Sequence, residues 1–216
     1  MRRITFIFIA LAAALVLTSG KPVKVACIGD SITFGYGMSM TSWSKCNMPA
    51  VLNGMLGEDY EVRNFGFSAR TMMNSGDKPY MKEKMYQDAK DYKADVITIM
   101  LGTNDTKPGN WTTSEEYAQD LTAMVKELKA AKPRPKIYLC YPAWISKPTW
   151  GMSDSLVVNC MIPAIDKVAR KNHVKVIDTH ATLEGHPDKY IADGIHPNTD
   201  GAAMLAEDIY KAIRKE

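Results

Sequence analysis

The chain has 216 residues, and its 27 Lys and Arg nearly balance 24 Asp and Glu, giving a formal net charge of +3. Without Arg2 and Arg3, which belong to a predicted signal peptide, the charge is about +1, so it gives no reason to expect a nucleic-acid or acidic partner. The length fits one domain with a single substantial core.

A signal peptide is predicted over residues 1–20. Two arginines follow Met1, residues 4–17 are almost wholly apolar, and small residues follow, as in a basic n-region, an h-region and a cleavage site. The apolar run is shorter than the roughly 20 residues that span a bilayer, which disfavours a membrane anchor. We therefore expect a secreted or periplasmic protein with no stable membrane insertion, whose mature domain covers residues 21–216.

Five short strands are predicted, because apolar, β-branched runs recur and each is closely followed by Gly, Pro, Asn or a hydroxyl residue. Helix-length segments alternate with them, which predicts a parallel sheet with helices on both faces. The predicted strands are Val23–Ile28, Tyr60–Phe65, Asp95–Leu101, Lys136–Tyr141 and Val174–Asp178. The predicted helices are Trp43–Leu56, Tyr80–Tyr92, Ser114–Ala131, Ser153–Lys171 and Asn198–Arg214.

The cysteines do not define a disulfide pattern. An exported protein can form disulfides, but the sequence does not specify a pairing. Two of the four lie in predicted strands and are expected to be buried small hydrophobes, and no CxxC or His-rich spacing suggests a metal site. The four are Cys27, Cys46, Cys140 and Cys160.

A serine stands directly after the first predicted strand, in the motif Gly29-Asp30-Ser31. A hydroxyl at the carboxyl end of a parallel strand projects into the crevice where open α/β sheets bind ligands. Because a serine alcohol is a poor nucleophile at its free pKa, catalysis also needs an imidazole base, a carboxylate to orient it, and donors for an oxyanion. Without these partners Ser31 would be only a helix cap.

Near the carboxyl terminus, the motif Asp193-Gly194-Ile195-His196 offers two of these partners. On an irregular loop the carboxylate can fold back onto the ring Nδ1, leaving Nε2 free to take a proton from a serine. The alternative is a helix-capping loop in which Asp193 and Asn198 satisfy backbone groups and His196 is incidental. Of the other histidines, His173 fits a solvated helix end, and neither His180 nor His186 has a carboxylate at this spacing.

Two further strand ends offer oxyanion donors. Asn104 follows the third strand, and its side-chain NH2 can stabilise an oxyanion without carrying a charge. Gly66 follows the second strand, where a glycine lets a backbone N–H approach a substrate closely. An Asx-type turn and a plain turn glycine are the ordinary alternatives. Since these strand ends share one rim with Ser31, the combination points to acyl transfer.

Four segments together resemble the blocks of the GDSL, or SGNH, hydrolases, in the family's order and over nearly the whole mature chain. The resemblance implies a flavodoxin-like three-layer α/β/α sandwich with strand order 2-1-3-4-5. It also implies a serine esterase whose mechanism needs no metal or organic cofactor. The segments are Gly29-Asp30-Ser31-Ile32, Gly66, Gly102-Thr103-Asn104-Asp105 and Asp193-Gly194-Ile195-His196-Pro197.

The resemblance also implies a role for each residue of the site. Ser31 is expected as the nucleophile and His196 as the base, with Asp193 orienting the ring. The amides of Ser31 and Gly66 and the side chain of Asn104 are expected to form the oxyanion hole.

Substrate contacts are expected from four residues, of which two are tryptophans on predicted loops, where aromatic faces suit sugar rings. Trp144 fits core filling equally well. Arg70 could meet an anionic substrate or form a structural ion pair, and Asp30 also fits a cap of its turn. Trp150, Tyr36 and Tyr141 are further aromatic residues on loops or strand ends. The four candidates are Asp30, Arg70, Trp111 and Trp144.

We expect a carbohydrate esterase that removes a short acyl group, most simply acetyl, for example from sialic acid or xylan. No long apolar lid segment is predicted, which weighs against long acyl chains. A lysophospholipase or thioesterase of the same family is the alternative enzyme, and a non-catalytic glycan-binding module is the alternative of another class. The sequence does not specify the oligomeric state.

Overall fold

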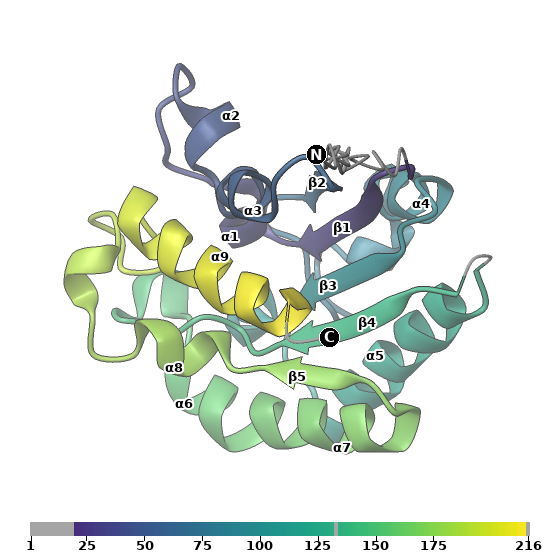
Figure 1. Cartoon of the computed structure of the whole chain (residues 1–216). Coiled ribbons are helices and arrows are strands. Elements are labelled where there is room, and N and C mark those ends of the chain that lie inside the picture. The colour runs from purple at the N-terminus through teal and green to yellow at the C-terminus, as the bar shows by residue number, and fades with distance from the viewer. Residues whose placement is uncertain (1–19, 132–133, 215–216) are drawn as a thin grey trace, which may run out of the picture.

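The computed structural model describes residues 20–131 and 134–214. The signal peptide expected over residues 1–20 therefore lies, apart from Gly20, outside the described residues. Five strands form one parallel sheet in the order β2-β1-β3-β4-β5 (Figure 1), which confirms the predicted order and the predicted fold class. The strands are β1 (Val23–Gly29), β2 (Tyr60–Gly66), β3 (Val96–Met100), β4 (Lys136–Cys140) and β5 (Lys175–Ile177).

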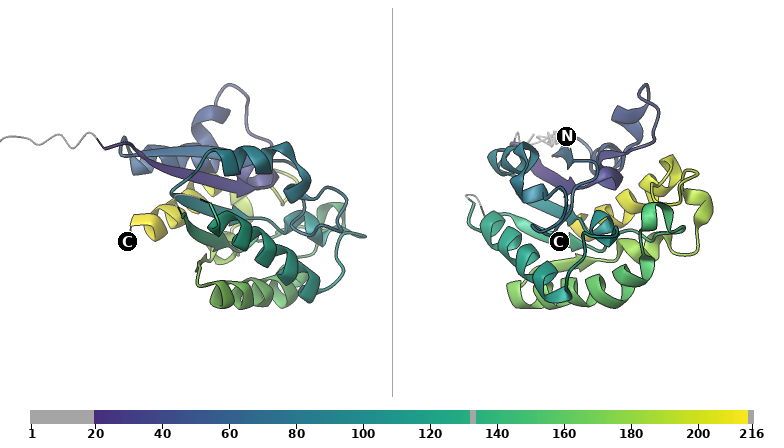
Figure 2. Two further views of the ribbon diagram at one scale, coloured as in Figure 1. Left: turned by 90° about the vertical axis from the view of Figure 1, so that its right-hand side faces the viewer. Right: turned by 180° about the vertical axis from the view of Figure 1, so that it is seen from behind.

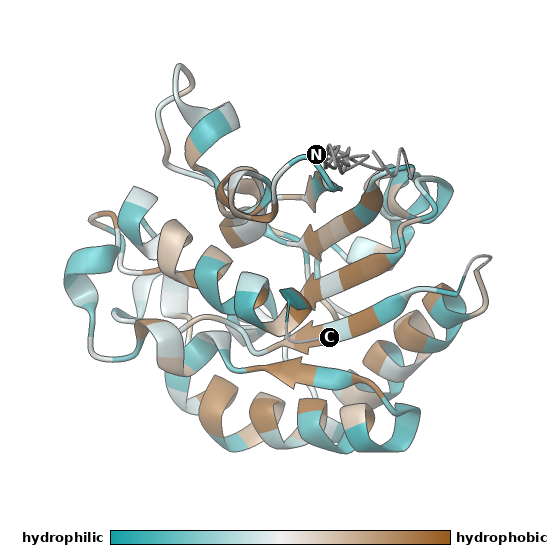
Figure 3. Cartoon of the chain, in the orientation of Figure 1, coloured by the Kyte–Doolittle hydropathy of each residue, from teal (hydrophilic) through white to brown (hydrophobic). Residues whose placement is uncertain are grey.

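Both faces of the sheet are buried along β1, β3 and β4, which explains why these strands are largely apolar. Along β1, Ala26 and Ile28 face one hydrophobic core, while Val25 and Cys27 face the other. The central strands are accordingly largely brown in Figure 3, and the outer faces of the helices carry much of the teal.

Helices lie on both sides of the sheet, as Figure 2 shows from two further directions. On one face, α3 (Met48–Leu56) and α9 (Thr199–Arg214) pack together over β1 and its neighbours. The other face is covered by α4 (Lys84–Asp91), α5 (Ser114–Lys129) and α7 (Ile162–Asn172). The remaining α-helices are α1 (Ser31–Phe34), α2 (Trp43–Cys46), α6 (Asp154–Leu156) and α8 (Thr179–Leu183). The turns of 3-10 or π helix are η1 (Tyr80–Lys82), η2 (Thr103–Thr106), η3 (Thr149–Gly151), η4 (Val157–Met161) and η5 (Pro187–Lys189).

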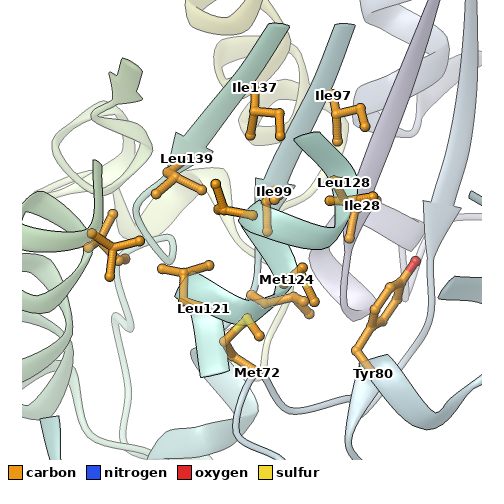
Figure 4. Packing of buried hydrophobic residues seen from close by; sticks show 14 of the residues in the cluster. Ile28, Met72, Tyr80, Ile97, Ile99, Leu121, Met124, Leu128, Ile137 and Leu139 are labelled. Atoms are coloured by element: carbon orange, nitrogen blue, oxygen red, sulfur yellow. The ribbon is translucent and has the colours of Figure 1, made fainter. Parts of the chain in front are cut away.

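Figure 4 shows the core beneath α5. Leu121 and Met124 recur at helical spacing on the buried face of α5, and they meet apolar side chains such as Ile99 and Leu139 from the strands. This packing fixes the relative positions of the strands, and with them the loops at the carboxyl ends of the strands.

Two predicted helices are interrupted near prolines. The segment Trp43–Leu56 is two helices, because α3 starts anew with Pro49 in its first turn and the Asn47 side chain accepting the Ala50 amide. The segment Ser153–Lys171 passes through the π-helical turn η4 just before Pro163, which has no N–H to continue the hydrogen-bond ladder. A third predicted helix, Tyr80–Tyr92, divides into η1 and α4 at Glu83, whose backbone is extended.

The four cysteines are free thiols. Cys27 and Cys140 are buried in the sheet, as their strand context predicted, and burial raises the pKa of Cys27 to about 12. In the described part of the chain, every helix is too short or too polar to cross a bilayer.

Candidate active site

Ser31 lies at the carboxyl end of β1, as the first residue of α1. The chain turns sharply there, and a Cβ on Gly29 would come within 2.0 Å of the Thr33 hydroxyl oxygen, so a glycine is needed for this approach. Asp30 caps α1 by accepting the Ile32 amide at 2.9 Å. The turn and the cap together fix the Ser31 hydroxyl at the rim of the sheet.

A continuous chain of hydrogen bonds leads from Ser31 to the carboxyl-terminal loop. The distance from His196 Nε2 to Ser31 Oγ is 2.8 Å, and that from His196 Nδ1 to Asp193 Oδ2 is 2.7 Å. When the Nδ1–H group donates a hydrogen bond to Asp193, Nε2 is the free acceptor, and it receives a hydrogen bond from the Ser31 hydroxyl. Serine, imidazole and carboxylate therefore have the geometry of a nucleophile, a general base and its orienting group.

The Asp193 carboxylate is held in its ionised form. Burial alone would raise the pKa of Asp193, but hydrogen bonds from the His196 amide and ring and from the Ile195 amide outweigh it and lower that pKa. Its Oδ1 accepts those two amides at 3.0 and 2.8 Å. A negative charge fixed beside Nδ1 stabilises the imidazolium that forms when Nε2 takes a proton.

Asn104 lies on η2, next to Ser31 on the same rim. Its side-chain nitrogen donates to Asp30 Oδ2 and to the Arg70 carbonyl, both at 3.2 Å. The backbone carbonyl of Asn104 accepts the Asn110 side-chain amide at 2.9 Å. The two side-chain bonds hold the Asn104 amide group in one orientation, and Asn104 lines the same pocket as Ser31.

Two buried carboxyl groups support this region. Asp105 accepts the Met72 amide at 2.9 Å and the Met73 amide at 2.7 Å, so it attaches η2 to the segment that follows β2. Burial raises the pKa of Asp105 to about 7 and that of Asp30 to about 6, against the opposing effect of the amide hydrogen bonds.

A pocket of about 310 Å³ opens over Ser31 and His196. Two aromatic rings lie close to the imidazole, with the Tyr36 centroid at 4.5 Å and the Trp150 centroid at 6.0 Å. The lining residues are Ser31, Tyr36, Ser68, Ala69, Asn104, Lys107, Trp150, Met152 and His196.

The sequence model of the GDSL-like lipase/acylhydrolase family matches residues 27–204 of this chain. The chain belongs to this family. An acetylxylan esterase of Xylanibacter ruminicola is 44% identical over 209 residues, which cover 89% of this chain and 43% of that protein. A multidomain esterase of Ruminococcus flavefaciens is 25% identical over 86% of this chain and 28% of its own length. This chain thus spans less than half the length of these two relatives.

Solved structures show the same fold. A carbohydrate acetylesterase from Sinorhizobium meliloti superposes with a TM-score of 0.75 at 20% identity, covering 89% of this chain and 99% of that one. The aryl esterase of M. Smegmatis gives a TM-score of 0.74 with the same identity and coverage. These similarities show that the chain has the same three-layer architecture as the two esterases.

Gly66 lies at the end of β2, but its amide is engaged inside the fold. It donates to Asn64 Oδ1 at 2.8 Å, and a Cβ on Gly66 would come within 2.2 Å of the Phe34 nitrogen. Gly66 thus allows α1 to pack closely on β2, and it does not line the pocket.

Ala69, three residues further on, does line the pocket and has a φ of +66°. This left-handed conformation is unusual for alanine, and it forms a turn at the wall of the pocket. A glycine at this position would have marked the turn in the sequence. With alanine there, sequence reasoning missed it.

The other predicted substrate contacts pack elsewhere. Arg70 forms an ion pair with Glu83 at 2.9 Å and lies over the Phe67 ring. Trp111 packs on Tyr117, with ring centroids 5.7 Å apart.

Trp144 and His180 also have partners within the fold. Trp144 packs on Tyr190, with ring centroids 6.0 Å apart. His180 has a carboxylate partner from a distant part of the chain, Asp154, with Nε2 and Oδ1 3.0 Å apart. Of the predicted loop aromatics, Tyr36 and Trp150 are therefore the ones that reach the pocket.

Proposed function

We propose that this chain is a carboxylic ester hydrolase that removes a short acyl group, in the first place acetyl, from a carbohydrate. One contact supports the reaction above all: His196 Nε2 lies 2.8 Å from Ser31 Oγ while its other ring nitrogen bonds Asp193. The acetylxylan esterase relative supports acetyl as the acyl group and a sugar as its carrier. The pocket, at the lower end of the roughly 300–1,000 Å³ of ligand sites, fits a short acyl group.

In the proposed first half-reaction, Ser31 Oγ attacks the ester carbonyl carbon while His196 Nε2 takes the hydroxyl proton. Asp193 stabilises the resulting imidazolium. His196 then donates that proton to the leaving alcohol oxygen, and the acyl group stays on Ser31. In the second half-reaction water attacks the acyl-enzyme with His196 again as the base, which releases the acid and restores the serine.

The tetrahedral intermediate needs donors for its oxyanion. We assign this role to the amides of Ser31 and Ala69 and to the side chain of Asn104, which lie around the pocket. The role that the resemblance gave to Gly66 passes to Ala69 in this proposal, because the Gly66 amide already donates to Asn64. The Asn104 bonds to Asp30 and Arg70 are long, at 3.2 Å, so a charged oxyanion can compete for the same hydrogens.

A serine-to-alanine variant tests the assignment. Ser31→Ala should lower the turnover of p-nitrophenyl acetate at least about 1000-fold, because the covalent step is lost, with the fold unchanged by circular dichroism. Turnover at the wild-type level would contradict it. With natural esters, acetate release from acetylated xylan and sialosides should exceed fatty-acid release from a lysophospholipid, and the reverse order would favour the alternative enzyme.

We also propose that residues 1–20 are removed as a signal peptide and that the mature domain is exported. Their basic, apolar and small residues support this, in that order along the chain.

A further inference from the structure

We infer that Tyr36 and Trp150 form the subsite for the alcohol part of the ester, and that this subsite takes a pyranose ring between or against its two aromatic faces. This inference rests on the proposed hydrolysis and names the group on which the acyl ester is carried. It begins with the position of the two rings relative to His196.

The two rings lie on the leaving-group side of the reaction. In the proposed mechanism His196 Nε2 must reach the alcohol oxygen to protonate it, so the rest of the alcohol occupies the space beside the imidazole. Tyr36 and Trp150 border this imidazole at centroid distances of 4.5 and 6.0 Å, and both line the pocket. They are therefore placed to touch the alcohol that leaves.

Both rings are left open to solvent. Tyr36 is 48% exposed and Trp150 is 55% exposed, in contrast to the aromatic side chains buried in the two cores. Aromatic surface that stays uncovered beside a polar reaction centre is typical of a binding site. An apolar face of this kind suits the C–H face of a sugar ring, because the negative face of an aromatic ring attracts weakly positive C–H groups.

The backbone holds the Trp150 ring at a conformational cost, since Trp150 has a φ of +56°, a region that favours glycine. Such strain persists where the surrounding structure maintains it, and it concentrates at functional sites. Tyr36 stands between Gly35 and Gly37, whose positive φ values glycine adopts readily, so the two glycines shape the turn that presents its ring.

The chain segments that carry the two rings are also hydrogen-bonded to the backbone of Ser31 and Asp193. The Tyr36 amide donates to the Ser31 carbonyl at 2.9 Å, and the hydroxyl of Thr149, next to Trp150, donates to the Asp193 carbonyl at 2.6 Å. A sugar held by the two rings would thus be held at a fixed position relative to Ser31 and His196, as an efficient reaction requires.

Leucine variants test the inference, because leucine keeps apolar bulk and removes the flat face. We compare kcat/KM for a mono-O-acetylated methyl xylopyranoside with that for ethyl acetate, whose ethyl group is too small to span either ring. Tyr36→Leu and Trp150→Leu should each lower the ratio of these two values about fivefold, and the double variant should lower it further. Tyr36→Phe and Trp150→Phe, which keep a ring, should restore most of the ratio.

The matched control is Met55→Leu, at an exposed apolar residue of α3 that lies outside the pocket, and it should leave both kcat/KM values unchanged. A ratio that stays at the wild-type value in both leucine variants, while ethyl acetate is still hydrolysed, would overturn the inference and leave the proposed function standing. An equal loss on both substrates would also overturn it, since the rings would then only position His196. If the wild-type protein hydrolyses neither of the two esters, the proposed function is overturned, and the inference is overturned with it.

Discussion

At the residue scale, the reactivity proposed for Ser31 depends on groups that come from three parts of the chain. The hydroxyl is on α1, the imidazole and carboxylate are on the loop before α9, and Asn104 is on η2. His196 Nε2 meets a serine 165 positions away at 2.8 Å, so the contact is made only by the complete fold.

Asn104 provides a test of the oxyanion site. Asn104→Ala should lower kcat for p-nitrophenyl acetate on the order of 100- to 1000-fold, because a donor to the developing charge is lost. The matched control is Asn159→Ala on η4, where the side chain bonds the Ser155 hydroxyl at an exposed position, and kcat should not change. A loss below threefold in Asn104→Ala would remove Asn104 from the oxyanion hole.

The motifs that carry chemistry could be predicted at this scale because their residue types and order are specific. The structure brings Ser31, His196 and Asp193 together as the sequence predicted. Ala69 was not predicted, and Trp150 was predicted only as a loop aromatic, because their positive φ values are imposed by the surrounding loops rather than by their side chains. Arg70 forms an ion pair with Glu83, and the residues around Arg70 in the sequence do not reveal this partner.

At the element scale, the loop after β4 is hydrogen-bonded to the loop before α9 and fixes its position. The segment 146–149 donates hydrogen bonds to three successive carbonyls of the loop that carries Asp193 and His196, those of residues 192–194. Gly194 has a φ of +70°, and a Cβ there would come within 2.7 Å of the Ser146 hydroxyl. The loop that carries Asp193 is therefore positioned by the loop after β4, which also carries Trp150.

The strands and the two long helices α5 and α9 could be predicted closely, because the buried faces impose regular apolar patterns. The observed β2 ends one residue beyond the predicted Tyr60–Phe65, and α5 matches the predicted start at Ser114. The break between α2 and α3 was missed, because an apolar pattern continues through the new N-cap at Asn47.

Asp105 connects η2 to the segment after β2 through a buried carboxyl group, and this makes stability depend on pH. Its pKa is raised by burial from 3.8 to about 7, so between these values the folded chain binds more protons than the unfolded one. The contribution of Asp105 to the free energy of unfolding therefore falls as pH rises from about 4 to 7, by at most about 4 kcal/mol.

Asp105→Asn removes this titration. Its amide group would place a donor against the Met72 or Met73 amide, so we expect the variant to be less stable than the wild type at pH 4. The difference between the two free energies of unfolding, measured with urea, should narrow as pH rises toward 8. A difference that stays constant or widens over this range would contradict a raised Asp105 pKa.

At the scale of the whole molecule, the parallel sheet is what assembles the site. Because β1 and β3 are adjacent and parallel, the loops after them open at the same edge, and Ser31 and Asn104 meet there. The loop before α9 then brings His196 to that edge while α9 itself packs on α3. The residues that match the GDSL-like lipase/acylhydrolase family, 27–204, therefore include segments that lie far apart in the sequence and meet at one edge of the sheet.

The most direct test of a serine nucleophile activated by His196 is covalent labelling with an organophosphonate, followed by peptide mass spectrometry. We predict one label per chain, on Ser31, and a labelling rate at least about 1000-fold lower in His196→Ala, because the base that takes the hydroxyl proton is missing. Labelling of another residue, or labelling of Ser31 at the wild-type rate in His196→Ala, would contradict the account.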